Sequence, residues 1–223
     1  MSGPPNFNRL ARLYRWMEWF SFGPWLALTR RDFLPEALHA RRALVLGDGD
    51  GRFTARLLRL NPEIQVDAVD ASSGMLDELL RRAGPYASRV RVHLADARTW
   101  QPPAPIDAEP YDLIATHFFL DCLTQHEVRA LVTRIGNATA PSALWVISEF
   151  AVPEGRFGTL IARPLVSALY WAFNRLTGLT VRALPDHGAA LRSAGFTQVE
   201  RRARLGGLLV SELWSTRPAG PFP

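Results

Sequence analysis

Residues 43–53 read Ala-Leu-Val-Leu-Gly-Asp-Gly-Asp-Gly-Arg-Phe, and this stretch decides the fold class. An apolar run enters three alternating glycines, Gly47, Gly49 and Gly51, and a helical pattern follows from Arg52. Glycines at such a turn let the backbone bend sharply and let a ligand approach the main chain at a helix N-terminus. The stretch therefore predicts a strand, a ligand-binding turn and a helix, which together open an α/β fold.

The rest of the chain continues this alternation, which is typical of a parallel sheet covered by helices. We expect strands near 43–47, 65–70, 90–95, 111–116 and 143–149, and helices near 52–60, 73–83 and 125–137. After Phe150 we expect helical residues at 155–178 and 185–194, then strands at 197–203 and 208–214. The turn Gly206-Gly207 joins these last two strands, and strands joined by a short turn pair antiparallel.

Composition narrows the protein class. The 223 residues are 48% hydrophobic and 21% charged, which predicts a single domain over residues 1–223. A lone cysteine, Cys122, cannot form an internal disulfide, so we expect a cytoplasmic protein. No apolar run reaches about 20 residues, so we expect no membrane-spanning segment. All 26 basic residues are scattered arginines, so we expect no nucleic-acid partner. The five histidines lack metal-ligand spacing, so we expect no metal.

The acids in the glycine turn discriminate between candidate ligands. Asp48 and Asp50 would repel the pyrophosphate of NAD or FAD, whereas the sulfonium and ammonium groups of S-adenosylmethionine meet no such repulsion. The dinucleotide fingerprint would also require glycine at position 52, where Arg52 stands. The alternative is a glycine-rich turn without a ligand.

Two further acids stand at the ends of predicted strands. Asp70 ends the second strand, 19 residues beyond Gly51, where a carboxylate can accept hydrogen bonds from both ribose hydroxyls. A helix cap is the alternative role for Asp70, although Ser72 is better placed for it. Asp96 ends the third strand and could accept from an adenine amino group.

These three strand ends resemble the class I S-adenosylmethionine-dependent methyltransferases, and the resemblance runs from about Phe7 to Trp214. It implies a three-layer, doubly wound, Rossmann-like α/β sheet of seven strands in the order 3-2-1-4-5-7-6, with the last strand antiparallel. It further implies an N-terminal helical cap over about 7–38 and a helical lid over about 154–180. The implied cofactor is S-adenosyl-L-methionine, which leaves as S-adenosyl-L-homocysteine.

The residues and the resemblance together indicate ten cofactor-binding positions. These are Gly47, Asp48, Gly49, Gly51, Asp70, Ala71, Met75, Asp96, Ala97 and Thr116. The family's Asp-x-Ser-x-x-Met pattern after the second strand is matched by Asp70, Ser72 and Met75. One departure is Val45, because the family usually has an acid two residues before the first glycine. Either the hold on the cofactor's amino end is weakened, or Asp48 or Asp50 replaces that acid.

The end of the fourth strand should face the methyl group. His117 is the candidate general base there, because its reference pKa is near neutral; a hydrogen-bonded scaffold role is the alternative. Nucleic-acid amino-methyltransferases usually carry Asn or Asp followed by Pro-Pro and an aromatic residue at this point. The stretch His117-Phe118-Phe119-Leu120 does not match that pattern, so we expect no DNA or RNA base as substrate.

The remaining candidate residues concern the methyl acceptor. Tyr14 and Met17 of the cap helix, Tyr170 of the lid, His117 and Phe118 are the candidate substrate contacts. Their character predicts a small, lipophilic or aromatic acceptor, quinone-like or lipid-like, as in the loosely similar ubiquinone and menaquinone C-methyltransferases. The acceptor atom, carbon, oxygen or nitrogen, stays open.

Other classes of function also stay open. The alternatives are a non-catalytic S-adenosylmethionine-binding module and, less favoured, a nucleotide-dependent oxidoreductase. The N-terminal helix either packs across the cofactor cleft or makes a peripheral membrane contact. We expect a monomer or a homodimer.

Overall fold

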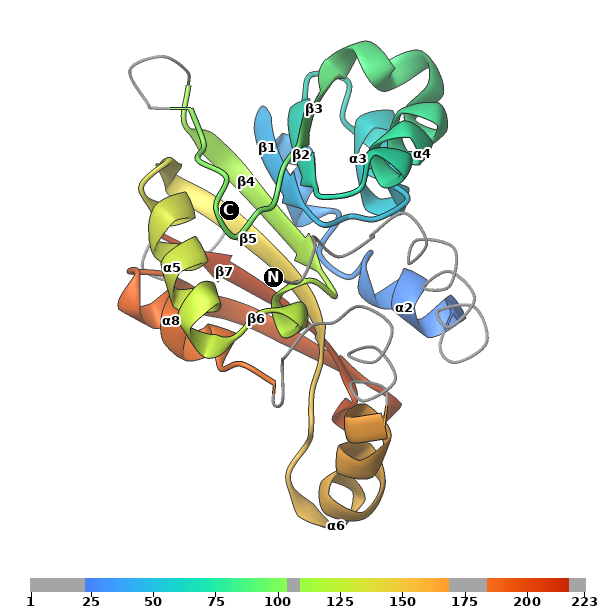
Figure 1. Ribbon diagram of the computed structural model, residues 1–223, viewed down its shortest axis with the longest axis vertical. Coiled ribbons are helices and arrows are strands. Elements are labelled where there is room, and N and C mark those ends of the chain that lie inside the picture. Colours follow the sequence, from blue (N-terminus) through green and yellow to red (C-terminus); the bar gives the residue numbers. More distant parts are fainter. Residues whose placement is uncertain (1–22, 104–108, 169–183, 217–223) are drawn as a thin grey trace, which may run out of the picture.

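A computed structural model describes residues 23–103, 109–168 and 184–216. Its centre is a seven-stranded sheet in the order β3-β2-β1-β4-β5-β7-β6 (Figure 1). The strands are β1 (Arg42–Leu46), β2 (Gln65–Asp70), β3 (Val90–Leu94), β4 (Tyr111–His117), β5 (Thr139–Phe150), β6 (Thr197–Arg204) and β7 (Leu209–Ser215). The strand order that the resemblance implied is confirmed.

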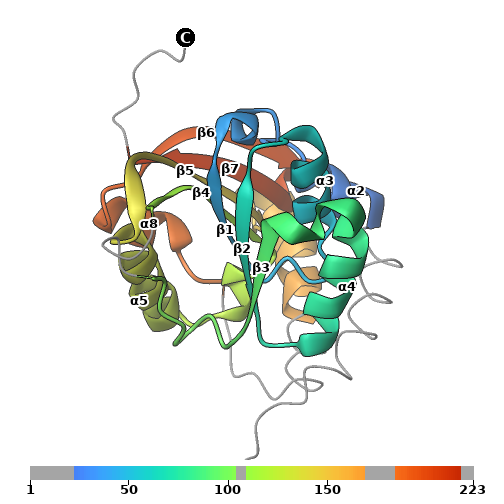
Figure 2. The same ribbon diagram turned by 90° about the horizontal axis from the view of Figure 1, so that it is seen from above.

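Helices cover both faces of this sheet, which gives the three expected layers (Figure 2). One face carries α3 (Arg52–Leu60) and α4 (Ser73–Ala83), and the other carries α5 (Gln125–Gly136) and α8 (His187–Ser193). Short helical segments are α2 (Gly23–Thr29), α6 (Gly155–Phe157), η1 (Glu36–His39), η2 (Gly84–Arg89), η3 (Leu120–Cys122), η4 (Gly158–Ala162) and η5 (Leu205–Gly207).

The direction of the strands places the candidate site. Strands β1 to β5 run parallel, and only β7 runs antiparallel to its neighbours β5 and β6, as expected. Parallel strands bring their carboxyl ends to the same edge of the sheet. The glycine turn after β1, Asp70 at the end of β2 and the turns after β3 and β4 therefore meet at one edge.

Two hydrophobic cores, one on each face, hold the sheet in place. One packs α5 and α8 against the sheet around Trp145 and Trp214. The other packs α3 and α4 against it around Phe53 and Leu57. Successive residues of a strand point to opposite faces, so Val45 enters the α3 core while Leu46 enters the α5 core.

One strand differs from expectation. β5 begins at Thr139, four residues earlier than the sequence indicated, although it contains Pro141. The pairing of β4 with β5 shifts register between Tyr111 and Leu113, and the shift accommodates this part of β5. Proline is tolerated at such an irregularity because a regular ladder hydrogen bond is not required there.

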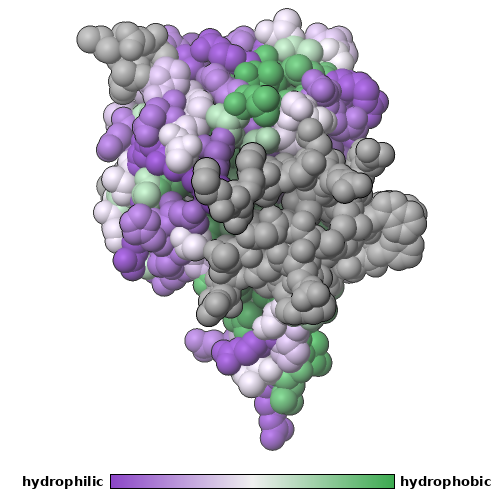
Figure 3. Space-filling model, in the orientation of Figure 1, coloured by the Kyte–Doolittle hydropathy of each residue, from purple (hydrophilic) through white to green (hydrophobic). Residues whose placement is uncertain are grey.

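The expected cap and lid lie partly outside the described residues, and their boundaries stay predictions. Tyr14, Met17 and Tyr170 are among the residues that the structure does not describe. Of the lid, α6 and η4 continue as helix to residue 168, and this segment projects from the body with exposed apolar side chains, Leu160 and Ile161 among them (Figures 1 and 3). Among the described residues, no helix has the length and apolar character needed to cross a membrane.

Candidate cofactor and acceptor site

The glycine turn after β1 has a conformation that favours glycine at all three positions. Gly47, Gly49 and Gly51 have φ angles of 65°, 60° and 77°, in the left-handed region. A Cβ on Gly47 would lie 2.5 Å from the Phe119 ring, and one on Gly51 would lie 2.7 Å from the Cα of Leu79. A Cβ on Gly49 would have no heavy atom of the described residues within 4 Å, apart from those of its two chain neighbours. Gly47 and Gly51 thus serve packing, whereas Gly49 leaves open space in which a ligand can approach the backbone.

Asp48 caps the helix that follows the turn and keeps one oxygen unused. Gly51 stands at the N-cap of α3 without a side chain, and Asp48 Oδ2 instead accepts from the amide and the hydroxyl of Thr54, at 2.9 and 2.7 Å. The other oxygen, Oδ1, is buried and has no hydrogen-bond partner in the described part of the chain. Burial raises the pKa of this carboxyl above its usual value. Oδ1 is therefore an unsatisfied acceptor beside the glycine turn, and it fits an ammonium donor.

Asp50 is engaged differently from Asp48. Its carboxylate pairs with Arg52 at 3.0 Å and with Arg82 of α4 at 2.8 Å. Val45, where the family usually has an acid, is buried in the α3 core. Of the two acids expected to replace it, Asp48 is the one with a buried oxygen that has no hydrogen-bond partner among the described residues.

Asp70 lies at the same edge as Asp48. Its Oδ1 accepts from the Ser72 amide at 2.8 Å, and the Ala71 amide also stabilises the charged form. Ser72 caps α4 by accepting from the Met75 amide at 3.3 Å, so the expected cap by Ser72 is confirmed. Burial, and next the charge of Asp48, raise the pKa of Asp70 to about 6. The parallel pairing of β1 with β2 brings the turns after these strands to the same edge, which agrees with an effect of Asp48 on Asp70.

The turn after β3 carries its acid in an ion pair. Arg98 donates to both oxygens of Asp96, with its Nη2 2.6 Å from Oδ2, and also reaches Glu127 at 3.3 Å. Burial acts to raise the pKa of Asp96, but the hydrogen bonds from Arg98 outweigh it and leave the pKa lowered. Ala97 is buried in the α5 core. Asp96 is thus held ionised at this edge with its oxygens already engaged.

Thr116 and His117 point to opposite faces of β4. Thr116 is fully buried, and its hydroxyl accepts from the Trp145 indole at 3.0 Å on the α5 face. His117 lies on the other face, where Nδ1 is 2.9 Å from the Ser148 hydroxyl and the ring packs on Phe53 at 4.4 Å between centroids. The two residues that we expected to face the methyl group together are therefore separated by the sheet.

The imidazole of His117 is enclosed. The residue is 2% exposed, and its Nε2 has no hydrogen-bond partner among the described residues. Burial, and next the charge of Arg30, lower the pKa of His117 to about 3. The ring is therefore neutral at physiological pH and has little tendency to take a proton, which argues for the scaffold role over the base role.

Sequence reasoning missed one acid in this region. Glu149, near the end of β5, is buried and accepts from the amides of Phe119 and Leu120 at 3.1 and 2.8 Å. A single carboxyl inside the apolar run Val146-Ile147-Ser148-Glu149-Phe150 is the sequence signal that could have identified it.

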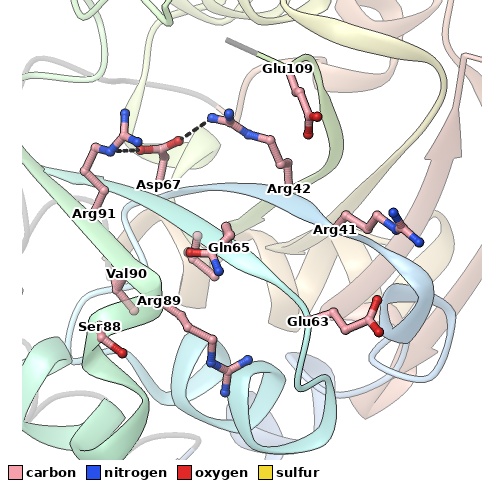
Figure 4. A pocket seen from close by; sticks show the side chains of 11 residues that line it. Arg41, Arg42, Glu63, Gln65, Asp67, Ser88, Arg89, Val90, Arg91 and Glu109 are labelled. Carbon is pink, nitrogen blue, oxygen red and sulfur yellow. Dashed lines mark hydrogen bonds and ion pairs between the residues drawn. The ribbon is translucent and has the colours of Figure 1, made fainter.

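A separate cavity of about 430 Å³ opens at the opposite, amino edge of the sheet (Figure 4). Arg42 and Arg91 point at Asp67 in its wall, with nitrogen–oxygen distances of 3.0 and 3.6 Å. Glu63 and Glu109 also line this cavity. Acidic and basic groups thus offset each other there. No metal-binding cluster of His, Cys, Asp or Glu occurs in the described ranges.

Comparisons with known proteins agree with this geometry. Residues 43–142 match the family model described as a methyltransferase domain. Malonyl-[acyl-carrier protein] O-methyltransferase of Halorhodospira halophila is 30% identical over 120 residues, which are 54% of this chain and 38% of that protein. The chain thus spans well under half the length of this relative.

Solved structures share the fold at lower identity. The S-adenosylmethionine-dependent methyltransferase SibL aligns over 98% of this chain and 64% of its own, with a TM-score of 0.62 and 24% identity. An O-methyltransferase family protein from Burkholderia thailandensis aligns over 97% of this chain and 62% of its own, with a TM-score of 0.68 and 15% identity.

A further structure was solved with the demethylated cofactor. The N-methyltransferase NodS of Bradyrhizobium japonicum, in complex with S-adenosyl-L-homocysteine, aligns over 85% of this chain and 87% of its own, with a TM-score of 0.61 and 16% identity. The family model covers the glycine turn and the ends of β2, β3 and β4, which the sheet brings to one edge. Residues 43–142 are therefore similar to a methyltransferase domain, and the chain shares the fold of solved S-adenosylmethionine-dependent methyltransferases.

Proposed function

We propose that this protein binds S-adenosylmethionine at the carboxyl edge of β1, β2 and β3 and transfers its methyl group to a small, lipophilic or aromatic molecule. One observation carries the proposal. The open backbone at Gly49 lies in the same turn as the unsatisfied Oδ1 of Asp48. The charge of Asp48 also contributes to raising the pKa of Asp70, at the end of the next strand. A ligand that is cationic at one end and carries vicinal hydroxyls matches this arrangement.

The residues then divide the cofactor between them. Asp48 Oδ1 accepts from the ammonium group, Gly49 allows close approach of the methionine part, and Asp70 accepts from the ribose hydroxyls. Ala71, Met75, Asp96 and Ala97 flank the adenine in this assignment. When bound, the cofactor supplies a methyl group activated by a positively charged sulfur.

The chain's contribution to catalysis is chiefly orientation. The neutral, enclosed His117 supports the position of β4 through Ser148 rather than taking a proton from the acceptor. Holding two reactants in line can supply a large part of a rate enhancement without a base. We therefore assign catalysis to proximity, with an acceptor that is already nucleophilic or that loses its proton to water.

The acceptor class is inferred from the apolar character of the same edge. Phe118 packs on Phe150 with 5.3 Å between ring centroids, and Leu26 and Leu209 complete this small cluster. Such surroundings favour an acceptor with hydrocarbon or aromatic surface. The relatives are named as O- and N-methyltransferases, so the methylated atom is left to experiment. The quinone-like acceptor, the membrane contact and the oligomeric state stay predictions.

Two measurements test this proposal. Calorimetry should show micromolar binding of S-adenosylmethionine and S-adenosylhomocysteine and no binding of NAD. Methyl-labelled S-adenosylmethionine, incubated with lipid and aromatic extracts of cells, should then yield a labelled organic product. Binding of NAD alone would favour the oxidoreductase. Binding of S-adenosylmethionine without turnover in any extract would favour the non-catalytic binding module.

A further inference from the structure

Glu149 is a buried acid whose side chain holds a turn of another strand. It is 1% exposed and lies near the carboxyl end of β5, beside β4. Its Oε1 accepts from the Phe119 amide at 3.1 Å and from the Leu120 amide at 2.8 Å, and the Asp121 amide acts to lower the pKa of this carboxyl. One carboxyl oxygen thus gathers the amides of the turn that follows β4.

That turn is strained where it leaves the strand. Phe118 has a φ of 55°, a conformation that bulky residues rarely adopt and that costs on the order of 1 to 3 kcal/mol. Its amide donates to the Ser148 carbonyl at 2.6 Å, next to Glu149 on β5. Strain of this kind persists only where neighbouring bonds hold the backbone. The bonds from Ser148 and Glu149 hold it here.

The strained turn presents Phe119 to the glycine turn. The Phe119 ring comes so close to Gly47 that a Cβ there would lie 2.5 Å from the ring. The ring therefore forms a wall against the turn at which we place the methionine part of the cofactor. A chain of contacts runs from Glu149 through the amides of residues 119 and 120 to Phe119 and Gly47.

The chemistry of Glu149 is unusual for a residue that merely fills space. Its second oxygen, Oε2, is buried and has no hydrogen-bond partner among the described residues. Burial, and next the charge of Asp121, raise the pKa of Glu149 well above its usual range. The charge of Glu149 in turn contributes to raising the pKa of Cys122 in the same turn. Burying a carboxyl with an unsatisfied oxygen costs free energy that an apolar residue would not. A cost of this kind is often found at functional sites.

We infer that Glu149 is a positioning residue of the cofactor site, which fixes the strained turn after β4 so that Phe119 walls the glycine turn. The inference rests on the proposed function, since it concerns the site at which the cofactor is placed. Glu149 acts through Phe119 and does not itself touch the cofactor. What matters is the accepting oxygen, so glutamine should replace glutamate and alanine should not.

The experiment measures the affinity for S-adenosylhomocysteine by calorimetry in the full chain, with folding checked by circular dichroism. Glu149→Gln keeps the accepting oxygen and should bind within about threefold of the unchanged protein. Glu149→Ala leaves the amides without an acceptor and should bind at least about tenfold more weakly. Phe119→Ala removes the wall directly and should show the same loss. Glu154→Ala is the matched control, an exposed acid shortly after β5, and should bind normally.

The outcomes separate the inference from the proposed function. If the unchanged protein does not bind S-adenosylhomocysteine, the proposed function fails. If it binds and Glu149→Ala binds equally well, the inference is overturned, even where the variant melts at a lower temperature. Equal loss in Glu149→Gln and Glu149→Ala would also overturn it. If Glu149→Ala does not fold, the affinity of Phe119→Ala for S-adenosylhomocysteine decides. Unchanged affinity overturns the inference, whereas weaker binding supports it, provided that Glu149→Gln binds normally.

Discussion

Replacing Asp70 with asparagine should stabilise the ligand-free protein at neutral pH while weakening its hold on the cofactor. The carboxyl of Asp70 has its pKa raised from 3.8 to about 6, first by burial and then by the charge of Asp48. Between these two values the native state keeps a proton that the unfolded chain has lost, so the free energy of unfolding falls as the pH rises. Asparagine keeps an accepting oxygen for the Ser72 amide and carries no charge.

The size of the effect follows from the pKa. Each pKa unit corresponds to about 1.36 kcal/mol, so the rise costs the native state at most about 3 kcal/mol above pH 6 and progressively less toward pH 4. Asp70→Asn should therefore raise the free energy of unfolding above that of the unchanged protein, and this increase should be about 2 kcal/mol larger at pH 7.5 than at pH 4.5. Loss of the charged acceptor for the ribose hydroxyls should lower the affinity for S-adenosylhomocysteine about tenfold or more.

Urea denaturation of the ligand-free protein at both pH values measures the first effect, and calorimetry with S-adenosylhomocysteine measures the second. Asp77→Asn is the control, because Asp77 is exposed on the neighbouring helix α4. A stability gain that does not grow with pH would refute the desolvation argument. A pH-dependent gain with unchanged affinity would remove Asp70 from the ribose site.

Two further predictions concern the glycine turn and the histidine. Gly51→Ala should lower the free energy of unfolding by about 2 kcal/mol or more, because the new Cβ would meet the Leu79 backbone. Gly49→Ala should lower it by only about 1 kcal/mol but should weaken S-adenosylhomocysteine binding at least as strongly as Gly51→Ala does. Equal melting temperatures of the two variants in a thermal melt would contradict this contrast. The His117 imidazole should stay neutral from pH 5 to 8 in an NMR titration, assigned with His117→Asn, because burial lowers its pKa to about 3; a midpoint near 6.5 would reopen the base role.

Much of the fold could be predicted because its signals are local. Helices α3 and α4 have the expected bounds, since each combines a start signal with apolar periodicity: the glycine turn before Arg52, and the Ser72 cap before Ser73. The early start of β5 was missed because Pro141 reads as a strand breaker. Its tolerance depends on the register of β4, which is a tertiary property.

The site was predicted less completely, because partners from distant segments decide which side chains are available. Asp48 and Asp50 look equivalent in the sequence. Arg82, which comes 32 residues after Asp50, forms an ion pair with Asp50 and leaves Asp48 available. The opposite orientations of Thr116 and His117 did have a local signal, since neighbouring residues in a strand point to opposite faces. The burial of the His117 ring against Phe53 had no such local signal.

The placement of β7 between β5 and β6 bears on the order in which the chain can fold during synthesis. Strands β1 to β4 can begin to pair soon after they emerge, but β5 keeps an open edge, and β6 has no partner, until β7 has been made. The carbonyl of Thr29 accepts from the hydroxyls of Ser148 and Ser211, so α2 also reaches its final contacts last. An exposed strand edge invites pairing with other chains. A nascent chain stalled before residue 209 should therefore depend on chaperones.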